Sequence, residues 1–198
     1  MERDIHRKRM VYSVRMRFPR TRMCIARKAT PLGLLVVILC SVSGFARPRP
    51  NASAQKPEKA DSILILKKDH VMELLSGGKV VRTYKVALGR GGLAPKQREG
   101  DARTPEGHYV IDAKYEHSAY HKTLHVSYPN AEDRKRAARL GVPPGGAIMI
   151  HGLPNGKGWV GAGHRLYDWT LGCIAVTDQE IDEIWTLVPV GTPVEIRP

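Results

Sequence analysis

The sequence contains little cysteine, few aromatic residues and no apolar run as long as a membrane-spanning helix needs. Three cysteines in 198 residues exclude a scaffold built on disulfide bonds. Aromatic residues make up only 6%, but 42% of the residues are hydrophobic, which excludes a wholly disordered chain and a multi-span membrane protein. A chain of this length is sufficient for one domain with a substantial core, or at most for two small ones.

Acidic residues are also scarce, because 19 Asp and Glu face 32 Lys and Arg and leave a net charge of +13. The excess is unevenly distributed: residues 1–46 carry +8, residues 47–60 carry +3, and residues 61–198 carry only +2. A surface that follows a phosphate backbone needs a basic groove. The nearly neutral body of the chain therefore argues against nucleic acid as a partner.

The basic N-terminal region has the order of a secretory signal peptide. A basic stretch at 3–28 precedes an apolar run at 32–40, and small residues follow up to Ala46. This order is typical of export signals, and the run is short for a membrane span, although an uncleaved N-terminal anchor is an alternative. We therefore expect residues 1–46 to be a signal peptide or membrane anchor, residues 47–60 to be a flexible linker, and the protein to be exported to the periplasm.

The body of the chain alternates short apolar segments with turns. Two segments carry helix signals: Asn130 is a suitable N-cap for a helix that Gly141 ends, and a capping-box pattern at 177–180 precedes apolar residues spaced i, i+3, i+4 and i+7. The glycine-rich segments 89–100 and 155–163 predict loops. Strand-like segments lie at 63–66, 71–75, 80–88, 108–113, 125–128, 147–150 and 194–196. The sequence therefore predicts one mainly β domain at 61–198, with a few short helices packed on it.

Cleavage at the end of the signal would leave Cys173 as the single cysteine, because Cys24 and Cys40 precede that point. A lone thiol in an exported protein has no intramolecular disulfide partner, so it is either needed for function or buried and inert. Gly172 directly before it permits an unusual backbone conformation, in which neighbouring N–H groups can face a developing oxyanion. A thiol nucleophile also needs a base, and the candidate is His151 at the end of a predicted strand.

The residues around this pair resemble a known family. His151-Gly152, a glycine-rich stretch and then Thr170-Leu171-Gly172-Cys173 resemble the H-G…[S/T]-x-G-C signature of the YkuD-type L,D-transpeptidase catalytic domain. The segments T-P-E-G at 104–107 and S-Y-P-N at 127–130 are similar to further parts of that family, so the resemblance covers 62–198. The motif D-W-T-x-G-C-I-A-V at 168–176 is similar to a subgroup that includes enzymes releasing an outer-membrane lipoprotein from peptidoglycan.

The resemblance implies a YkuD-type β-sandwich that acts on peptidoglycan stem peptides without a metal or organic cofactor. Cys173 would attack the carbonyl of an L-centre, expel a D-residue and form a thioester, while His151 moves protons. Resolution by an amine would be L,D-transpeptidation in cell-wall biogenesis. Resolution by water would make the protein an amidase that releases peptidoglycan-linked lipoprotein, or an endopeptidase. Both outcomes stay open, because many family members have histidine where this chain has Leu171.

Several neighbouring residues are weaker candidates. Gly172 and Thr170 would form or position the oxyanion site. Asp168 could orient a histidine, as the third member of a catalytic triad does, or cap a loop. His164 is a candidate for substrate contact, and Arg103 for bidentate binding of a substrate carboxylate.

Three histidines, His117, His121 and His125, are spaced by four and could share one face of a helix or strand. The chain has no H-E-x-x-H pattern, and no nearby carboxylate is suited to act as a general base. We expect these histidines to line a cleft or a solvated edge rather than to bind a metal.

Overall fold

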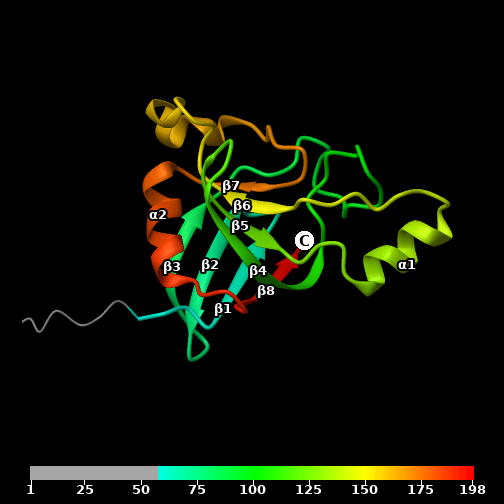
Figure 1. Ribbon diagram of the computed structural model, residues 1–198, viewed down its shortest axis with the longest axis horizontal. Helices are drawn as coiled ribbons and strands as arrows, with labels where there is room; N and C mark the ends of the chain where they lie inside the picture. The colour runs from blue at the N-terminus through cyan, green and yellow to red at the C-terminus, as the bar shows by residue number, and fades with distance from the viewer. Residues whose placement is uncertain (1–57) are drawn as a thin grey trace, which may run out of the picture. The chain divides into compact units, whose positions relative to one another are not determined.

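The computed structural model describes residues 58–198, which form eight strands and three helices (Figure 1). The strands are β1 (Ser62–Leu66), β2 (Val71–Ser76), β3 (Lys79–Lys85), β4 (Gly107–His117), β5 (His121–Val126), β6 (Met149–His151), β7 (Ile174–Ala175) and β8 (Pro193–Arg197). The helices are α1 (Ala131–Arg139), α2 (Asp178–Leu187) and the 3-10 helix η1 (Gly158–Leu166). The prediction of a mainly β domain with a few short helices is confirmed.

The strands follow the order β3-β2-β1-β8-β4-β5-β6-β7. Strand β4 is the longest, with 11 residues, and it pairs with β8 through its first part and with β5 through its second. A register shift between Ile111 and Ala113 marks the change of partner, and such irregularities bend a strand. At the far end of the order, β6 and β7 run parallel to each other. This pairing brings together two segments that are more than 20 residues apart in the chain.

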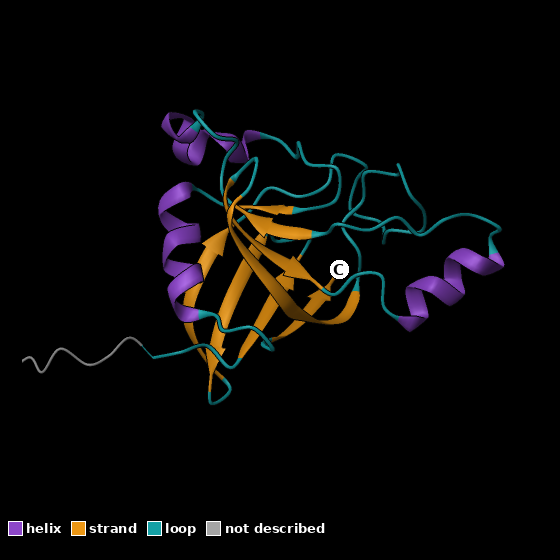
Figure 2. Cartoon of the chain, viewed as in Figure 1, coloured by secondary structure: helices purple, strands orange, loops and turns teal. Residues whose placement is uncertain are grey.

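One core joins the two parts of the strand order. Ile65 of β1 and Met72 of β2 belong to the same buried apolar cluster as Leu124 of β5 and Ile150 of β6, and all four are fully buried. The helix α2 adds Ile184, and Figure 2 shows α2 beside the strands and α1 set apart from them. Each such side chain contributes about 1.5–3 kcal/mol when fully buried, so β6 is held firmly where it delivers its last residue, His151.

Both predicted helices form, and each begins with a capping box. Asn130 accepts a hydrogen bond from the Asp133 N–H at the start of α1, and the Asp133 carboxylate accepts one from the Asn130 N–H. Thr177 and Glu180 exchange the equivalent bonds at the start of α2. These bonds satisfy N–H groups that the helical ladder leaves unpaired.

Two local predictions differ from the structure. Strand β5 begins at His121, four residues before the predicted segment, because its outer half pairs with the end of β4. The segment predicted as a loop at 155–163 contains most of η1, which is interrupted by a kink at Gly161. Short 3-10 turns have no apolar period from which a sequence pattern could identify them.

The predicted N-terminal segments lie largely outside the described residues. The signal or anchor segment at 1–46 is not described, and of the linker only residues 58–60 are. Ala60, the last linker residue, is already buried and donates its N–H to the Leu187 carbonyl of α2 at 2.9 Å. None of the helices within 58–198 has the length and apolar character that crossing a bilayer requires.

Candidate active site

Cys173 lies directly before β7, at the end of a tight turn that begins at Thr170. Its thiol is free and partly exposed, and Sγ donates to the Ala147 carbonyl at 3.5 Å. Ala147 has a φ of 55°, a left-handed conformation that is uncommon for a residue with a side chain. This conformation stores about 1–2 kcal/mol of strain, and at Ala147 it accompanies the carbonyl's contact with the thiol.

His151 ends β6 and lies on the strand beside β7. In the parallel register Ile150 is opposite Ile174 and His151 is opposite Ala175, so the histidine lies two positions along from the cysteine on the neighbouring strand. The His151 ring is 2% exposed, and Nδ1 is 2.6 Å from the Gly152 carbonyl. Because a carbonyl only accepts, Nδ1 carries the proton, and Nε2 is left as the acceptor.

Gly152 allows the chain to turn closely after this histidine. A Cβ at this position would lie 2.5 Å from the His121 carbonyl oxygen and 2.8 Å from Asp178 Oδ1. Any side chain would therefore push the His151 segment away from β5 and α2, which explains in physical terms why the pair His-Gly is needed here.

The electrostatics leave both members of the pair uncharged at neutral pH. Burial lowers the pKa of His151 to about 4, against the Gly152 hydrogen bond, and the nearby His164 lowers it further. Burial also raises the pKa of the Cys173 thiol, although the Met149 N–H and the positive charge of Lys96 oppose this effect. The arrangement is therefore a neutral thiol beside a neutral imidazole, which can act as a general base when the thiol attacks.

The turn before the cysteine is built by Thr170 and Gly172. The Thr170 hydroxyl accepts from the Gly172 N–H at 3.1 Å and donates to the Cys173 carbonyl at 2.7 Å. Gly172 has a φ of 127°, and a Cβ there would lie 2.6 Å from the Arg103 carbonyl oxygen. Both residues thus shape the turn that precedes Cys173. The Gly172 N–H is already bonded, whereas no hydrogen-bond partner for the Cys173 N–H is found within 58–198.

Asp168 is bonded to residues other than His151. Its carboxylate accepts from the Leu88 N–H at 2.7 Å and is 3.0 Å from His70 Nε2. The group that orients His151 in this structure is instead the backbone carbonyl of Gly152. Asp168 therefore anchors the segment before the cysteine to the segment after β3.

An aromatic group surrounds the His151 ring. The ring of Tyr120 lies 4.1 Å from it, between centroids, and Trp169 meets its edge at 5.8 Å. The Trp169 Nε1–H also points to Nδ1 of the buried His164 at 3.4 Å, while His164 Nε2 has no partner among the described residues. His164 thus lies behind Trp169, in a separate small pocket of about 180 Å³. Sequence reasoning missed Tyr120, since it precedes β5 in an irregular turn.

Arg103 does not line the cysteine's pocket. Its Nε donates to the Gly91 carbonyl at 3.2 Å, and its side chain lines another hollow beside Gln97 and Arg98. The next residue, Thr104, is buried, and its hydroxyl accepts from the Gly89 N–H at 3.0 Å. The T-P-E-G segment therefore braces the loop behind Gly172.

A pocket of about 410 Å³ contains both Cys173 and His151. Lys96 and Glu99 bring charged side chains to its wall, and neither was recognised from the sequence, because both lie in a loop that only the fold brings to the site. The remaining lining residues are Gly100, Ala102, Tyr120, Gly145, Gly146, Ala147, Ile148, Thr170 and Leu171.

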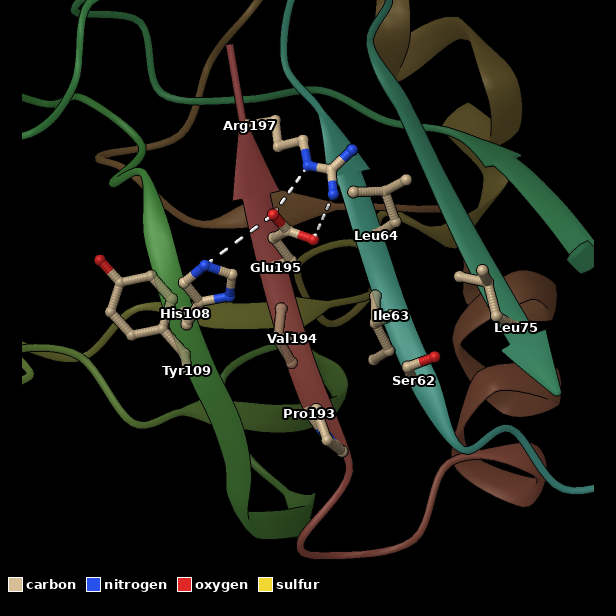
Figure 3. A pocket seen from close by; sticks show the side chains of 10 residues that line it. All are labelled: Ser62, Ile63, Leu64, Leu75, His108, Tyr109, Pro193, Val194, Glu195 and Arg197. Carbon is tan, nitrogen blue, oxygen red and sulfur yellow. Dashed lines mark hydrogen bonds and ion pairs between the residues drawn. The ribbon is translucent and has the colours of Figure 1, made fainter. Parts of the chain in front are cut away.

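A hollow of about 260 Å³ lies elsewhere, between β4, β8, β1 and β2 (Figure 3). Its charged groups satisfy one another, because Glu195 is 2.7 Å from Arg197 and 3.9 Å from His108. It contains neither a thiol nor a base aimed at one. Among residues 58–198 no cluster of His, Cys, Asp and Glu has the arrangement of a metal site, and His121 and His125 are paired with Asp182 and Asp112.

The chain is similar in sequence to a family of catalytic domains and to a curated protein. The family model for the YkuD L,D-transpeptidase catalytic domain matches residues 60–196. YafK of Escherichia coli strain K12, a protein named as a candidate L,D-transpeptidase, is 34% identical over 112 residues, which are 56% of this chain and 38% of YafK.

Solved structures agree with these sequence matches. A variant of the helical cell shape determining protein Pgp2 from Campylobacter jejuni is similar with a TM-score of 0.55 and 25% identity, over 71% of this chain and 48% of that one. Bd1075 from Bdellovibrio bacteriovorus has a similar fold, with a TM-score of 0.50 and 21% identity, over 71% and 48% of the two chains. The chain spans less than half the length of each of these three relatives.

Proposed function

We propose that this chain, which belongs to the YkuD family of L,D-transpeptidase catalytic domains as its motifs predicted, is an acyltransferase of the cell wall that acts on peptidoglycan stem peptides. One observation carries the assignment within the family: Cys173 and His151 share one pocket, and the adjacent parallel strands β6 and β7 hold them two residue positions apart. Cys173 is the nucleophile, His151 is the general acid and base, and the intermediate is a thioester.

The proposed reaction follows from the protonation states. His151 Nε2 takes the thiol proton as Sγ forms a bond to the carbonyl carbon of an L-centre. The Cys173 N–H stabilises the oxyanion, since the Gly172 N–H is engaged by Thr170. The tetrahedral intermediate then breaks its C–N bond, and the departing amine of the D-residue receives the proton from His151. An acceptor amine attacks the resulting thioester and gives a proton to His151, and the released sulfur recovers that proton.

We place the reaction in the periplasm. The basic stretch and the apolar run within 1–46 support export, and this segment is either cleaved or kept as a membrane anchor. Residues 47–60 would then be a flexible tether for the catalytic domain. The near-neutral body at 61–198 supports a substrate other than nucleic acid.

Intact sacculi incubated with the purified protein test the assignment. Exchange of a terminal D-amino acid on stem peptides, lost in Cys173→Ala and in His151→Ala, is the expected result. Release of peptidoglycan-linked lipoprotein without any exchange would identify a hydrolase instead. Processing by Cys173→Ala at the wild-type rate would overturn the role of the thiol altogether.

A further inference from the structure

The charges on the wall of the Cys173 pocket are not balanced. Lys96 is buried, and its Nζ is 2.8 Å from Asp101 Oδ1 and 3.1 Å from the Arg98 carbonyl oxygen. Burial opposes ionisation of Asp101, but the Lys96 ammonium and then three backbone N–H groups outweigh it and lower the Asp101 pKa to about 2. The Lys96 charge is therefore compensated by a permanently ionised partner.

Glu99 has no such compensation. Its backbone N–H donates to the Pro143 carbonyl at 2.8 Å, and its Cβ packs against Gly145, where a methyl group would approach it to 3.3 Å. Two loops thus fix the backbone of Glu99 at the wall of the pocket. No hydrogen bond or ion pair to its carboxylate is found among residues 58–198, and the residue is exposed.

Among the charged side chains that line the pocket, Glu99 is therefore the one without an ion-pair partner within residues 58–198. Lys96 is neutralised by Asp101, and His151 is neutral at pH 7, with a pKa of about 4. A carboxylate on the wall of a pocket that also holds a reactive thiol attracts cations and raises their local concentration. Of the two nucleophiles that can resolve a thioester, an amine carries a positive charge in its resting form and water does not.

We propose that Glu99 binds the acyl acceptor as an ammonium ion and thereby favours transfer to an amine over hydrolysis. The inference rests on the proposed function, because it concerns the second half of the same reaction. The acceptor class that fits is a primary amine, which is an ammonium ion in its resting form at pH 7.

The chemical step balances without any further reagent. The bound ammonium first releases one proton to water and becomes an amine. Its nitrogen lone pair then forms the C–N bond to the thioester carbonyl, and His151 Nε2 takes a second proton from that nitrogen. The C–S bond breaks, and the thiolate of Cys173 collects the proton from His151. Glu99 holds and positions the acceptor but exchanges no proton in this sequence.

The test measures how one acyl-enzyme is partitioned between two products. A tetrapeptide stem from peptidoglycan is the donor, and glycinamide, which is largely cationic at pH 7, is the acceptor. Hydroxylamine, which is neutral at pH 7, is the control nucleophile. Chromatography with mass detection gives the ratio of aminolysis to hydrolysis for wild type, Glu99→Gln and Glu99→Lys, with Glu132→Gln on α1 as the matched change of net charge.

An exposed charge contributes about 0.5–1 kcal/mol, so Glu99→Gln should lower the ratio for glycinamide about two- to fivefold. Glu99→Lys should lower it about tenfold, and hydroxylamine should give the same ratio in every variant. The loss should shrink as salt rises to about 0.5 M, where charges are screened within about 4 Å. A purely structural role of Glu99 would instead change both nucleophiles equally.

The outcomes separate this inference from the proposed function. A wild type that gains no acyl mass on Cys173 would refute the proposed function. A wild type that transfers to glycinamide, with Glu99→Gln giving an unchanged ratio, would overturn the inference alone. An acyl-enzyme that forms but reacts only with water would overturn the inference and leave the thioester chemistry in place.

Discussion

The resting state of the Cys173–His151 pair can be tested by replacing His151 with alanine. Burial raises the pKa of the thiol and lowers that of the imidazole to about 4, so the free protein holds two neutral groups rather than a thiolate and an imidazolium. The neutral pair and the ion pair differ in how fast they react with a small alkylating reagent such as iodoacetamide, because only the thiolate attacks this reagent.

The expected magnitudes are well separated. A thiol with the ordinary pKa of about 8.5 is about 3% thiolate at pH 7, and burial makes the fraction smaller still. A preformed ion pair would be almost fully thiolate, at least about 30-fold more reactive. We expect the wild-type alkylation rate to rise about tenfold per pH unit from 6 to 8, and His151→Ala to change it less than about threefold. Turnover of an acyl donor should fall about 10²–10⁴-fold in the same variant, because a general base is lost.

Intact-protein mass spectrometry follows the alkylation, and release of the terminal D-residue follows turnover. Cys173→Ala, which keeps Cys24 and Cys40, measures the background label that is subtracted from the wild-type signal. His108→Ala removes an exposed histidine on β4, outside the pocket, and controls for the loss of an imidazole. A wild-type rate that is flat from pH 5 to 8 and falls about 30-fold in His151→Ala would refute the neutral pair.

Three further predictions concern stability and the turn. Gly172→Ala should destabilise the fold by about 2 kcal/mol, seen as a fall in Tm of roughly 4–10 °C, whereas Gly92→Ala, at a φ of 86° with open space around it, should cost about 1 kcal/mol. His151 is buried as the neutral form, so stability is complete above its unfolded pKa of about 6.5 and decreases as the pH falls toward 4, by up to about 3 kcal/mol. Urea unfolding from pH 7 to pH 4 should show a smaller loss of unfolding free energy in His151→Gln than in the wild type. An identical dependence on pH would refute the claim that His151 is buried in its neutral form. Thr170→Val should lower kcat about tenfold, because it removes the hydrogen bonds to the Gly172 N–H and the Cys173 carbonyl. Thr170→Ser keeps the hydroxyl and should retain most of the activity. Equal rates for the two variants would show that the hydroxyl is not needed.

The strands and helices with strong local signals could be predicted from the sequence. The capping box at 177–180 and the apolar spacing after it specify α2 within a few residues, because these signals act over one or two helical turns. The 3-10 helix η1 could not be predicted, because it depends on how a glycine-rich segment lies over the rest of the site. The proximity of Cys173 and His151 was inferred from a family signature, and its physical cause, the parallel pairing of β6 and β7, is not contained in any local pattern.

Residues close in sequence to the nucleophile were poor guides to the site. Asp168 lies five positions before Cys173, yet its carboxylate bonds Leu88 and His70, which are 80 and 98 residues away in the chain. Such long-range hydrogen bonds depend on the complete fold, so an acid near a cysteine in sequence carries little information about a triad. The same reason explains why Tyr120 was missed: it approaches His151 only because β5 pairs with β6.

The loop at 89–107 contains two charged residues of the pocket wall, and their ion pairing depends on the fold rather than on the local sequence. Lys96 is a basic residue in a glycine-rich loop. Its buried pairing with Asp101 engages the ammonium group, although the positive charge of Lys96 still opposes the rise in the thiol pKa. Glu99, which is three residues further on, also lines the pocket and is unpaired in the described structure. Under the inference drawn above, the thiol stays neutral until an acyl donor binds, and Glu99 then selects a cationic acceptor.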